Sequence, residues 1–198
     1  MHVPEVLRAS SPVPFFMVWN TVLALVPLGL AFVLFRRGAR TGTVTWWAGV
    51  ALFVVMLPNA PYVLTDVVHL VDGARHGVTI TTLLLYCAFV SVGMLAYTAS
   101  IAWCSAHLRR TGVPLVTAVL AEGGLHALVA VGVLMGRYGR WNSWDLGLRP
   151  FHVLTDTLGY ANLRGAAAVV LLAAGIAVIS ALLRLAAYGA ADLVRSDA

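Results

Sequence analysis

Five strongly apolar segments recur along this chain of 198 residues, and short polar stretches separate them. A transmembrane helix needs about 20 predominantly apolar residues. The candidates are Phe15–Phe35, Val44–Leu57 with a continuation, Val78–Trp103, Val113–Met135 and Gly165–Leu185. Hydrophobic residues make up 61% of the chain and charged residues only 11%, a composition outside the range of soluble domains. The sequence therefore predicts an all-α fold, a polytopic membrane helix bundle of about five transmembrane helices in a single domain over residues 1–198.

The thirteen basic residues are all arginines, and most lie close to the ends of the apolar segments. They have no polar surface on which to form a stripe for nucleic acid, so we expect no nucleic-acid partner. Seven arginines fall on the side that includes the C-terminal tail and six on the other side, where five acidic residues accompany them. The positive-inside rule then predicts a multi-pass protein of the inner (plasma) membrane, with its N-terminus outside and its C-terminus in the cytoplasm.

The second apolar segment is only about two thirds of a membrane crossing, and it ends at the run Pro58-Asn59-Ala60-Pro61. Each proline removes a backbone donor and disfavours helix in the residue before it, so we expect the span to break there. Carbonyl groups freed at such a break must be satisfied within the protein or by water, and broken helices are where many transporters place substrate or ion sites. A proline kink that only assists packing is an equally good interpretation.

The residues after the break, from Tyr62 onwards, have the pattern of a short amphipathic helix at the outer interface. Tyr62, Asp66 and His69 fall at positions i, i+4 and i+7, so they would share one face. An aspartate and a histidine three residues apart can ligate a metal together, or the carboxylate can orient the imidazole as a general base. A solvated polar face of an interfacial helix explains the same pattern.

Glu122 and His126 interrupt the fourth apolar segment, one helical turn apart. An ionisable side chain near mid-membrane costs at least about 2.5 kcal/mol unless it faces a partner or water, so both residues are functional candidates. One alternative is that Glu122 and His126 interact with each other and need no further partner. The other is a neutral Glu122 that forms a hydrogen bond to Asn20 or Ser91. The two glycines that follow Glu122 predict close helix packing at this point.

The fourth segment leads into the most chemically mixed stretch of the chain, residues 136–145. Its two tryptophans suit the headgroup region as anchors, but its arginine, asparagine and aspartate side chains need another explanation. Arg137 and Arg140 are three residues apart, about one helical turn, and could clamp a phosphate or a carboxylate. Alternatively, they could pair with Asp66 and Asp145 and so hold the two polar runs together.

Both polar runs should lie at the same membrane depth if the helices alternate in direction, so we predict that they are halves of one site on the outer side. The predicted catalytic residues are Asp66, His69, Glu122 and His126. The candidate ligands for a divalent transition metal are Asp66, His69 and His126. The residues expected to bind a substrate are Asn20, Asn59, Tyr62, Arg137, Arg140, Trp141, Asn142, Trp144 and Asp145.

Residues 150–156 repeat the Val-Leu-Thr-Asp sequence of residues 63–66, but the flanking spans show no comparable similarity. Coincidence, or a shared preference for an interfacial helix that starts with proline, explains this better than an internal duplication. His152 and Asp156, one helical turn apart, are secondary candidates for the same site.

The chain resembles the domain-of-unknown-function family number 1361 of prokaryotic integral membrane proteins. The resemblance rests on Trp19-Asn20 in the first segment, the run from Leu57 to Tyr62 with Thr65-Asp66 and His69-Leu70, and Gly136-Arg137 with the run from Arg140 to Asp145. It implies a compact multi-helix membrane protein, and it supplies no activity, substrate or cofactor. The short interfacial helices on the outer side are predicted from the residues themselves.

Three classes of function remain open. A membrane-embedded, metal-dependent enzyme acting on a lipid or cell-envelope substrate explains the mixture of ionisable groups best, although no catalytic signature is present. A small ion-coupled transporter would use the broken span, with Glu122 and His126 as proton carriers, and would need to form a homodimer. An accessory or assembly subunit would bind another membrane protein or a lipid. The expected partners are the lipid bilayer and an anionic lipid or small molecule.

Overall fold

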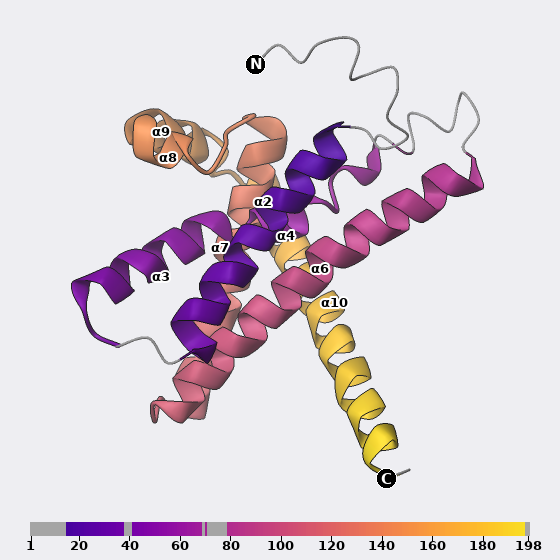
Figure 1. Ribbon diagram of the computed structural model, residues 1–198. Coiled ribbons are helices and arrows are strands. Elements are labelled where there is room, and N and C mark those ends of the chain that lie inside the picture. Colours follow the sequence, from indigo (N-terminus) through magenta and orange to yellow (C-terminus); the bar gives the residue numbers. More distant parts are fainter. Residues whose placement is uncertain (1–14, 38–40, 69, 71–78, 197–198) are drawn as a thin grey trace.

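The structure, a computed structural model, describes residues 15–37, 41–68, 70 and 79–196. Its described part contains helices and no strand, and five helical segments are long and apolar enough to cross a membrane (Figure 1). The predicted all-α membrane helix bundle is therefore confirmed. In chain order the elements are α2 (Phe15–Ala31), η1 (Phe32–Arg36), α3 (Val44–Met56), α4 (Asn59–Tyr62), α6 (Ile80–Arg110), α7 (Leu115–Tyr138), α8 (Asp145–Leu148), α9 (Pro150–Gly159) and α10 (Leu163–Ser196).

Each predicted apolar segment corresponds to one long helix or to two consecutive helices. The first span is α2 with η1, the second is α3 with α4, and the others are α6, α7 and α10. Helices α6 and α10 contain 31 and 34 residues and extend beyond the predicted segments. Apolar composition marks only the part of a helix suited to hydrocarbon, whereas backbone hydrogen bonds continue into its polar ends. Helix α6 ends just before Gly112, whose φ of 82° turns the chain towards α7.

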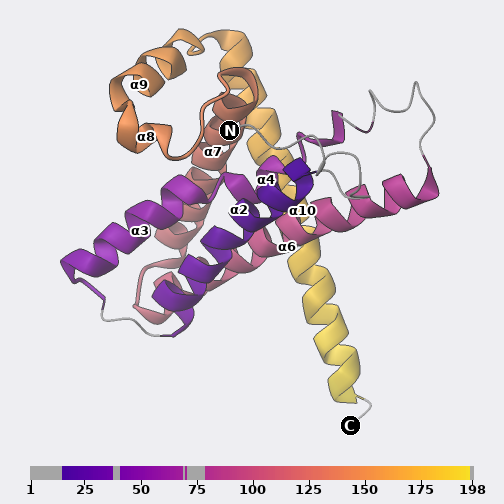
Figure 2. The same cartoon turned by 45° about the horizontal axis from the view of Figure 1, so that its top comes forward.

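Helices α2 and α6 cross at the centre of the bundle, and α4 lies between α2, α6 and α7 (Figures 1 and 2). Helix α10 packs against α7 and α6, and α3 packs against α2 and η1. Leu57, Val63 and Tyr97 are fully buried in the core that these helices share. Only 11% of the apolar window of α10 is buried inside the chain, so most of this helix is left to face lipid.

Glycines on α6 and α7 allow α4 to lie deep in the bundle. A Cβ atom on Gly93 would lie 2.6 Å from the carbonyl oxygen of Ala60, and one on Gly132 would lie 2.5 Å from the ring of Pro58. Gly136, one turn after Gly132, lies against the ring of Tyr62 in the same way. Small residues at these positions let the backbones approach closely, as they do between many membrane helices.

The prediction of close helix packing at Gly123 and Gly124 is wrong. A Cβ atom on either glycine would meet nothing within 4 Å among the described residues. Small residues permit close approach but do not cause it, because the neighbouring helix must also lie on that face of α7. The close approach occurs further along α7, at Gly132 and Gly136.

The second span is broken where the two prolines predict it. Helix α3 ends at Met56, and the short α4 begins at Asn59. The Nδ2 group of Asn59 donates a hydrogen bond of 2.9 Å to the carbonyl oxygen of Met56, so a side chain of the break itself satisfies a carbonyl there. Residues 63–66 form turns with i→i−3 hydrogen bonds instead of the regular α-helix expected after Tyr62.

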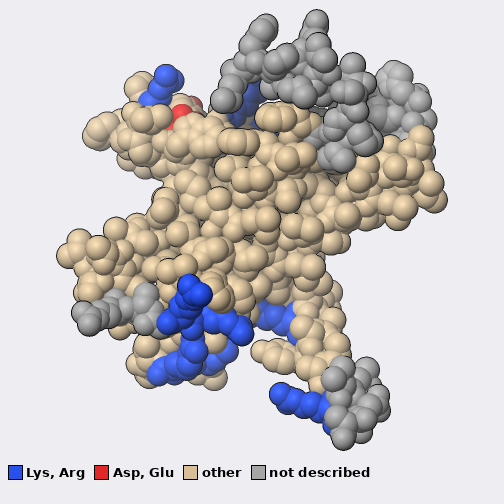
Figure 3. Space-filling model, viewed as in Figure 1, with Lys and Arg blue, Asp and Glu red and all other residues tan. Residues whose placement is uncertain are grey.

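The two ends of the bundle differ in charge. Helices α8 and α9 lie together at the end where α7 finishes, which we call the α8–α9 end (Figure 1). At the opposite end, η1 and α6 finish in arginine pairs, and Figure 3 shows arginines gathered there. The pairs are Arg36 with Arg37 and Arg109 with Arg110. Arg110 Nη2 donates a hydrogen bond of 2.7 Å to the carbonyl oxygen of Phe35, which joins the two helix ends.

Candidate functional site

A cavity of about 860 Å³ lies between α2, α3, α4 and α7 and is partly covered by α8 and α9. It is lined by seven of the nine residues that were predicted to bind a substrate, and also by Asp66 and Ser143. The polar and aromatic lining residues from these predictions are Asn20, Asn59, Tyr62, Asp66, Arg137, Arg140, Trp141 and Asn142. Trp144 and Asp145 do not line the cavity.

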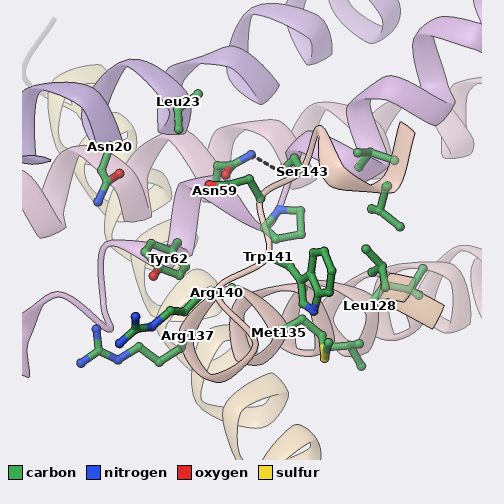
Figure 4. Close-up of a pocket in the computed structure, with 18 of the residues that line it drawn as sticks. Asn20, Leu23, Asn59, Tyr62, Leu128, Met135, Arg137, Arg140, Trp141 and Ser143 are labelled. Atoms are coloured by element: carbon green, nitrogen blue, oxygen red, sulfur yellow. Dashed lines mark hydrogen bonds between the residues drawn. The ribbon is translucent and has the colours of Figure 1, made fainter. Parts of the chain in front are cut away.

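The two predicted polar runs meet at this cavity. Asn59, at the break in the second span, donates a hydrogen bond of 2.8 Å from Nδ2 to Ser143 Oγ in the loop after α7 (Figure 4). The same Nδ2 group also donates to the carbonyl oxygen of Met56. One amide therefore supplies a hydrogen bond at the helix break and attaches the loop of the second polar run to it. The proline break therefore positions the loop that follows α7.

Asp66 is almost completely buried in the cavity wall, with 3% of its surface exposed. Asn20 Nδ2, from α2, donates a hydrogen bond of 2.7 Å to Asp66 Oδ2. A buried carboxylate needs such donors, because leaving it without them costs several kilocalories per mole. This bond connects α2 to the turns after α4 and places the carboxylate at the cavity.

Arg137 lies in the last turn of α7, and Arg140 lies just after the helix ends. Neither guanidinium forms an ion pair with any residue that the structure describes. The pairing with Asp66 and Asp145, the alternative to a ligand clamp, is therefore not formed. Asp145 Oδ2 instead accepts a hydrogen bond of 2.8 Å from the backbone N–H of Asn142, which closes the local turn before α8.

Trp141 is held in place by Asp156, one of the two secondary candidates from the sequence. Its Nε1–H donates a hydrogen bond of 3.1 Å to Asp156 Oδ2 on α9. Asp156 thus fixes an indole of the cavity wall without lining the cavity itself, and His152 on the same helix is exposed and does not line it either.

The cavity has a polar side and an apolar side. Figure 4 shows Asn20, Tyr62 and both arginines toward one side and Leu128 toward the other, with the Trp141 ring lying between them. The guanidinium groups of Arg137 and Arg140 run in the same direction and lie close to Tyr62 in this view. The apolar lining also includes Val54, Val55, Leu128, Val131 and Met135. Such a cavity can accept a molecule with a charged end and an apolar end.

Glu122 and His126 belong to a second polar cluster, which we call the Glu122 cluster. Glu122 Oε1 lies 2.9 Å from Arg184 Nη1 on α10 and 3.7 Å from His126 Nε2. Ser105 on α6 donates a hydrogen bond to Glu122 Oε2, and the hydroxyl of Tyr97 lies 2.6 Å from His126 Nδ1. The cluster therefore joins α6, α7 and α10.

The structure does not bring the Glu122 cluster to the cavity. Glu122 and Arg137 lie 15 residues apart on one helix, a separation of about 22 Å along its axis. Neither Glu122 nor His126 lines the cavity, so Asp66 and His126 do not share a site as predicted. The sequence indicated the Glu122–His126 pair but missed Arg184, which lies within the last apolar segment.

The predicted metal ligands Asp66, His69 and His126 are not all described, so the metal site stays a prediction. His69 lies outside the described residues. Among those described, no three or more histidine, cysteine, aspartate or glutamate side chains are grouped so that they could hold a metal ion. Asp66 and His126 each have other partners, as given above.

Comparison with known proteins identifies the family but no activity. No curated protein matches this chain, and no solved structure matches it either. The model of one family, described as a protein of unknown function (DUF1361), matches residues 19–180. This match spans both polar runs and most of every membrane-spanning helix. The chain therefore belongs to the DUF1361 family of proteins of unknown function.

Proposed function

We propose that this protein binds an anionic, phosphate-bearing amphiphile of the membrane, such as a phospholipid or a lipid-linked cell-envelope precursor, in the cavity beneath α8 and α9. The observation that carries the proposal is the pair of arginines, Arg137 and Arg140, at one side of a cavity whose other side is apolar. A headgroup with its attached chain has the same division of polarity.

The electrostatics of the arginine pair support an anionic ligand. Arg137 and Arg140 have no ion-pair partner among the described residues, and their side chains run in the same direction in Figure 4. A phosphate between them would accept charge-assisted hydrogen bonds from both guanidinium groups, which is the geometry that arginine suits. Either a bound anion or solvent would then stabilise the positive charges of the two guanidinium groups.

The apolar side of the cavity supports a ligand with a hydrocarbon chain. Its side chains come from α3 and α7, two helices that the bilayer surrounds under this proposal. A chain lying against Val54, Leu128 and Val131 would bury apolar surface that a free inorganic anion cannot cover. The ligand would therefore reach its site from the membrane.

Asp66 supports a catalytic extension of the same proposal. Among the described residues it is the acidic residue of the cavity lining, and it is buried. A carboxylate beside a bound phosphate ester can act as a general acid or base in hydrolysis or transfer of the headgroup. In this extension Asp66 is the catalytic residue, and Asn20 positions it.

The orientation that suits this proposal places the α8–α9 end outside the inner (plasma) membrane. The arginine pairs at the ends of η1 and α6 lie at the opposite end of the bundle, which the positive-inside rule assigns to the cytoplasm. The cavity would then face the cell envelope.

The double variant Arg137→Gln, Arg140→Gln removes both guanidinium groups from the cavity. We expect it to bind phosphatidylglycerol about tenfold or more weakly than the parent, because it loses the charge-assisted hydrogen bonds. Binding is measured on the detergent-solubilised protein by native mass spectrometry at a series of lipid concentrations. Arg149→Gln is the matched control, since Arg149 is exposed and does not line the cavity. Equal binding by the double variant and the control would overturn the proposal.

A further inference from the structure

The cavity offers more hydrogen-bonding groups than a phosphate can use. A phosphodiester oxygen only accepts hydrogen bonds, so it matches the arginines but not the side-chain oxygens of the wall. Asn20 and Asn59 both use their Nδ2 groups within the protein, toward Asp66 and Ser143. No hydrogen bond from a described residue reaches either Oδ1 atom, so each remains able to accept one.

Two hydroxyl groups add to this surplus. The hydroxyl of Tyr62 has no hydrogen-bond partner among the described residues, and the Ser143 hydroxyl, which accepts from Asn59, has no acceptor among them for its own hydrogen. The polar side of the cavity therefore combines neutral acceptors with groups that can both donate and accept. A complementary headgroup must itself carry donors as well as acceptors.

We infer that the headgroup is a polyol, such as glycerol, inositol or a sugar, joined to the phosphate; this inference rests on the proposed function. Hydroxyl groups donate and accept, so they match the asparagine oxygens together with the hydroxyls of Tyr62 and Ser143. An ammonium group would also supply donors and could pair with Asp66, but the two guanidinium groups of Arg137 and Arg140 outnumber this one carboxylate in the cavity lining and disfavour a further cation.

Aromatic rings in the wall support the same headgroup. Trp19, Tyr62 and Trp141 all line the cavity. The apolar faces of such rings pack against the C–H groups of a polyol or a sugar ring, while its hydroxyls bond to polar neighbours. The Trp141 ring is held by Asp156 on α9, so this surface exists before a ligand binds.

The volume of the cavity leaves room for this headgroup. Small-molecule sites occupy roughly 300–1,000 Å³, and the cavity of about 860 Å³ lies in the upper part of that range. A phosphate group alone would leave most of it unfilled. A polyol phosphate with the first part of a hydrocarbon chain would occupy both the polar and the apolar side.

The test compares two lipids of equal charge, of which one has a headgroup with two free hydroxyl groups and the other has a headgroup with none. Phosphatidylglycerol and phosphatidylethanol with identical acyl chains are each titrated against the full-length protein in detergent, with binding measured by native mass spectrometry. We expect phosphatidylglycerol to bind about fivefold to tenfold more tightly than phosphatidylethanol, as one or two additional hydrogen bonds would give. The variant Tyr62→Phe should reduce this ratio, because it removes a hydroxyl and keeps the ring that packs on Gly136.

Each alternative outcome identifies a different error. Equal affinity for the two lipids, with both weakened by Arg137→Gln, Arg140→Gln, would overturn the polyol headgroup and leave the phosphate site in place. Tighter binding of phosphatidylethanolamine than of either lipid would also overturn it, in favour of an amine. Binding that does not depend on the two arginines would overturn the proposed function itself. Displacement of the lipid by an equal concentration of free glycerol 3-phosphate would overturn the requirement for a hydrocarbon chain. A melting temperature of Tyr62→Phe equal to that of the parent shows that the variant remains folded.

Discussion

Arg140 has a positive φ of 55°, a backbone conformation that residues other than glycine rarely adopt. Such a conformation costs about 1–3 kcal/mol when the residue has a Cβ atom, and it persists where the surrounding structure requires it. The chain turns back here after α7, and the backbone N–H of Trp141 donates to the carbonyl oxygen of Met135. Glycine would suit this turn better, so the presence of arginine is consistent with a use for its side chain.

Arg140→Gly should have opposite effects on stability and on binding. Glycine removes the backbone strain, so the free energy of unfolding should stay the same or rise by up to about 1 kcal/mol. The melting temperature of the detergent-solubilised protein should change in the same direction. Affinity for phosphatidylglycerol should fall, because one guanidinium is lost. Thermal unfolding and lipid titration on the same preparation measure both. A clear loss of stability would show that the Arg140 side chain supports the fold.

Glu122 and Arg184 form an ion pair inside the bundle, and each side chain is about three quarters buried, with 23% and 22% exposed. Removing one partner leaves the other charge in surroundings of low dielectric constant without compensation. We expect Glu122→Gln to destabilise the protein by about 2–4 kcal/mol, measured by thermal or denaturant unfolding in detergent.

A double-mutant cycle distinguishes the ion pair from a general effect on packing. The double variant Glu122→Gln, Arg184→Gln removes both charges, so its loss of stability should be smaller than the sum of the two single losses. Additive losses would mean that the two side chains contribute independently and that the ion pair itself contributes little.

At the scale of elements, the position of α4 depends on glycines of its neighbours. Gly93→Ala would place a Cβ atom 2.6 Å from a backbone oxygen of α4 and 2.5 Å from the side chain of Val63, so α4 or α6 would have to move. We expect this variant to lose about 1–3 kcal/mol of stability, the usual cost of overpacking. Unfolding in detergent provides the measurement.

Gly123→Ala is the matched control, because the same substitution on α7 meets no atom of a described residue within 4 Å. Alanine is the better helix former by roughly 0.5–1 kcal/mol, so the control should be neutral or slightly more stable. If Gly93→Ala were equally well tolerated, close packing of α4 on α6 would not be required for the fold.

Sequence patterns predicted the elements well because local physical rules govern them. Apolar length identifies a span, and two prolines break a helix wherever they occur within it. The contact between the two polar runs could also be predicted, because helices that alternate in direction return the chain to the same membrane depth. The partners of Glu122 could not be predicted, because the rotation of α10 that presents Arg184 to α7 depends on packing across the whole bundle. Which glycines lie at a helix contact could not be predicted either, because this also depends on how the helices pack.

At the scale of the whole molecule, α7 connects two polar regions of different character. Near its start, the Glu122 cluster contains charges that neutralise each other within the described part of the bundle. At its other end, the arginines of the cavity have no such compensation from described residues. The first arrangement suits a structural contact between helices, and the second suits a ligand.

The length of α10 has a further consequence. With 34 residues the helix is about 50 Å long, whereas the hydrocarbon core of a bilayer is about 30 Å thick. It must therefore tilt or extend into the headgroup regions, and the thickness of the surrounding membrane sets how far. Its first turn follows α9 almost directly, with Asn162 Oδ1 accepting a hydrogen bond from the backbone N–H of Gly165. We therefore expect bilayer thickness to act mechanically on the helix pair that covers the cavity.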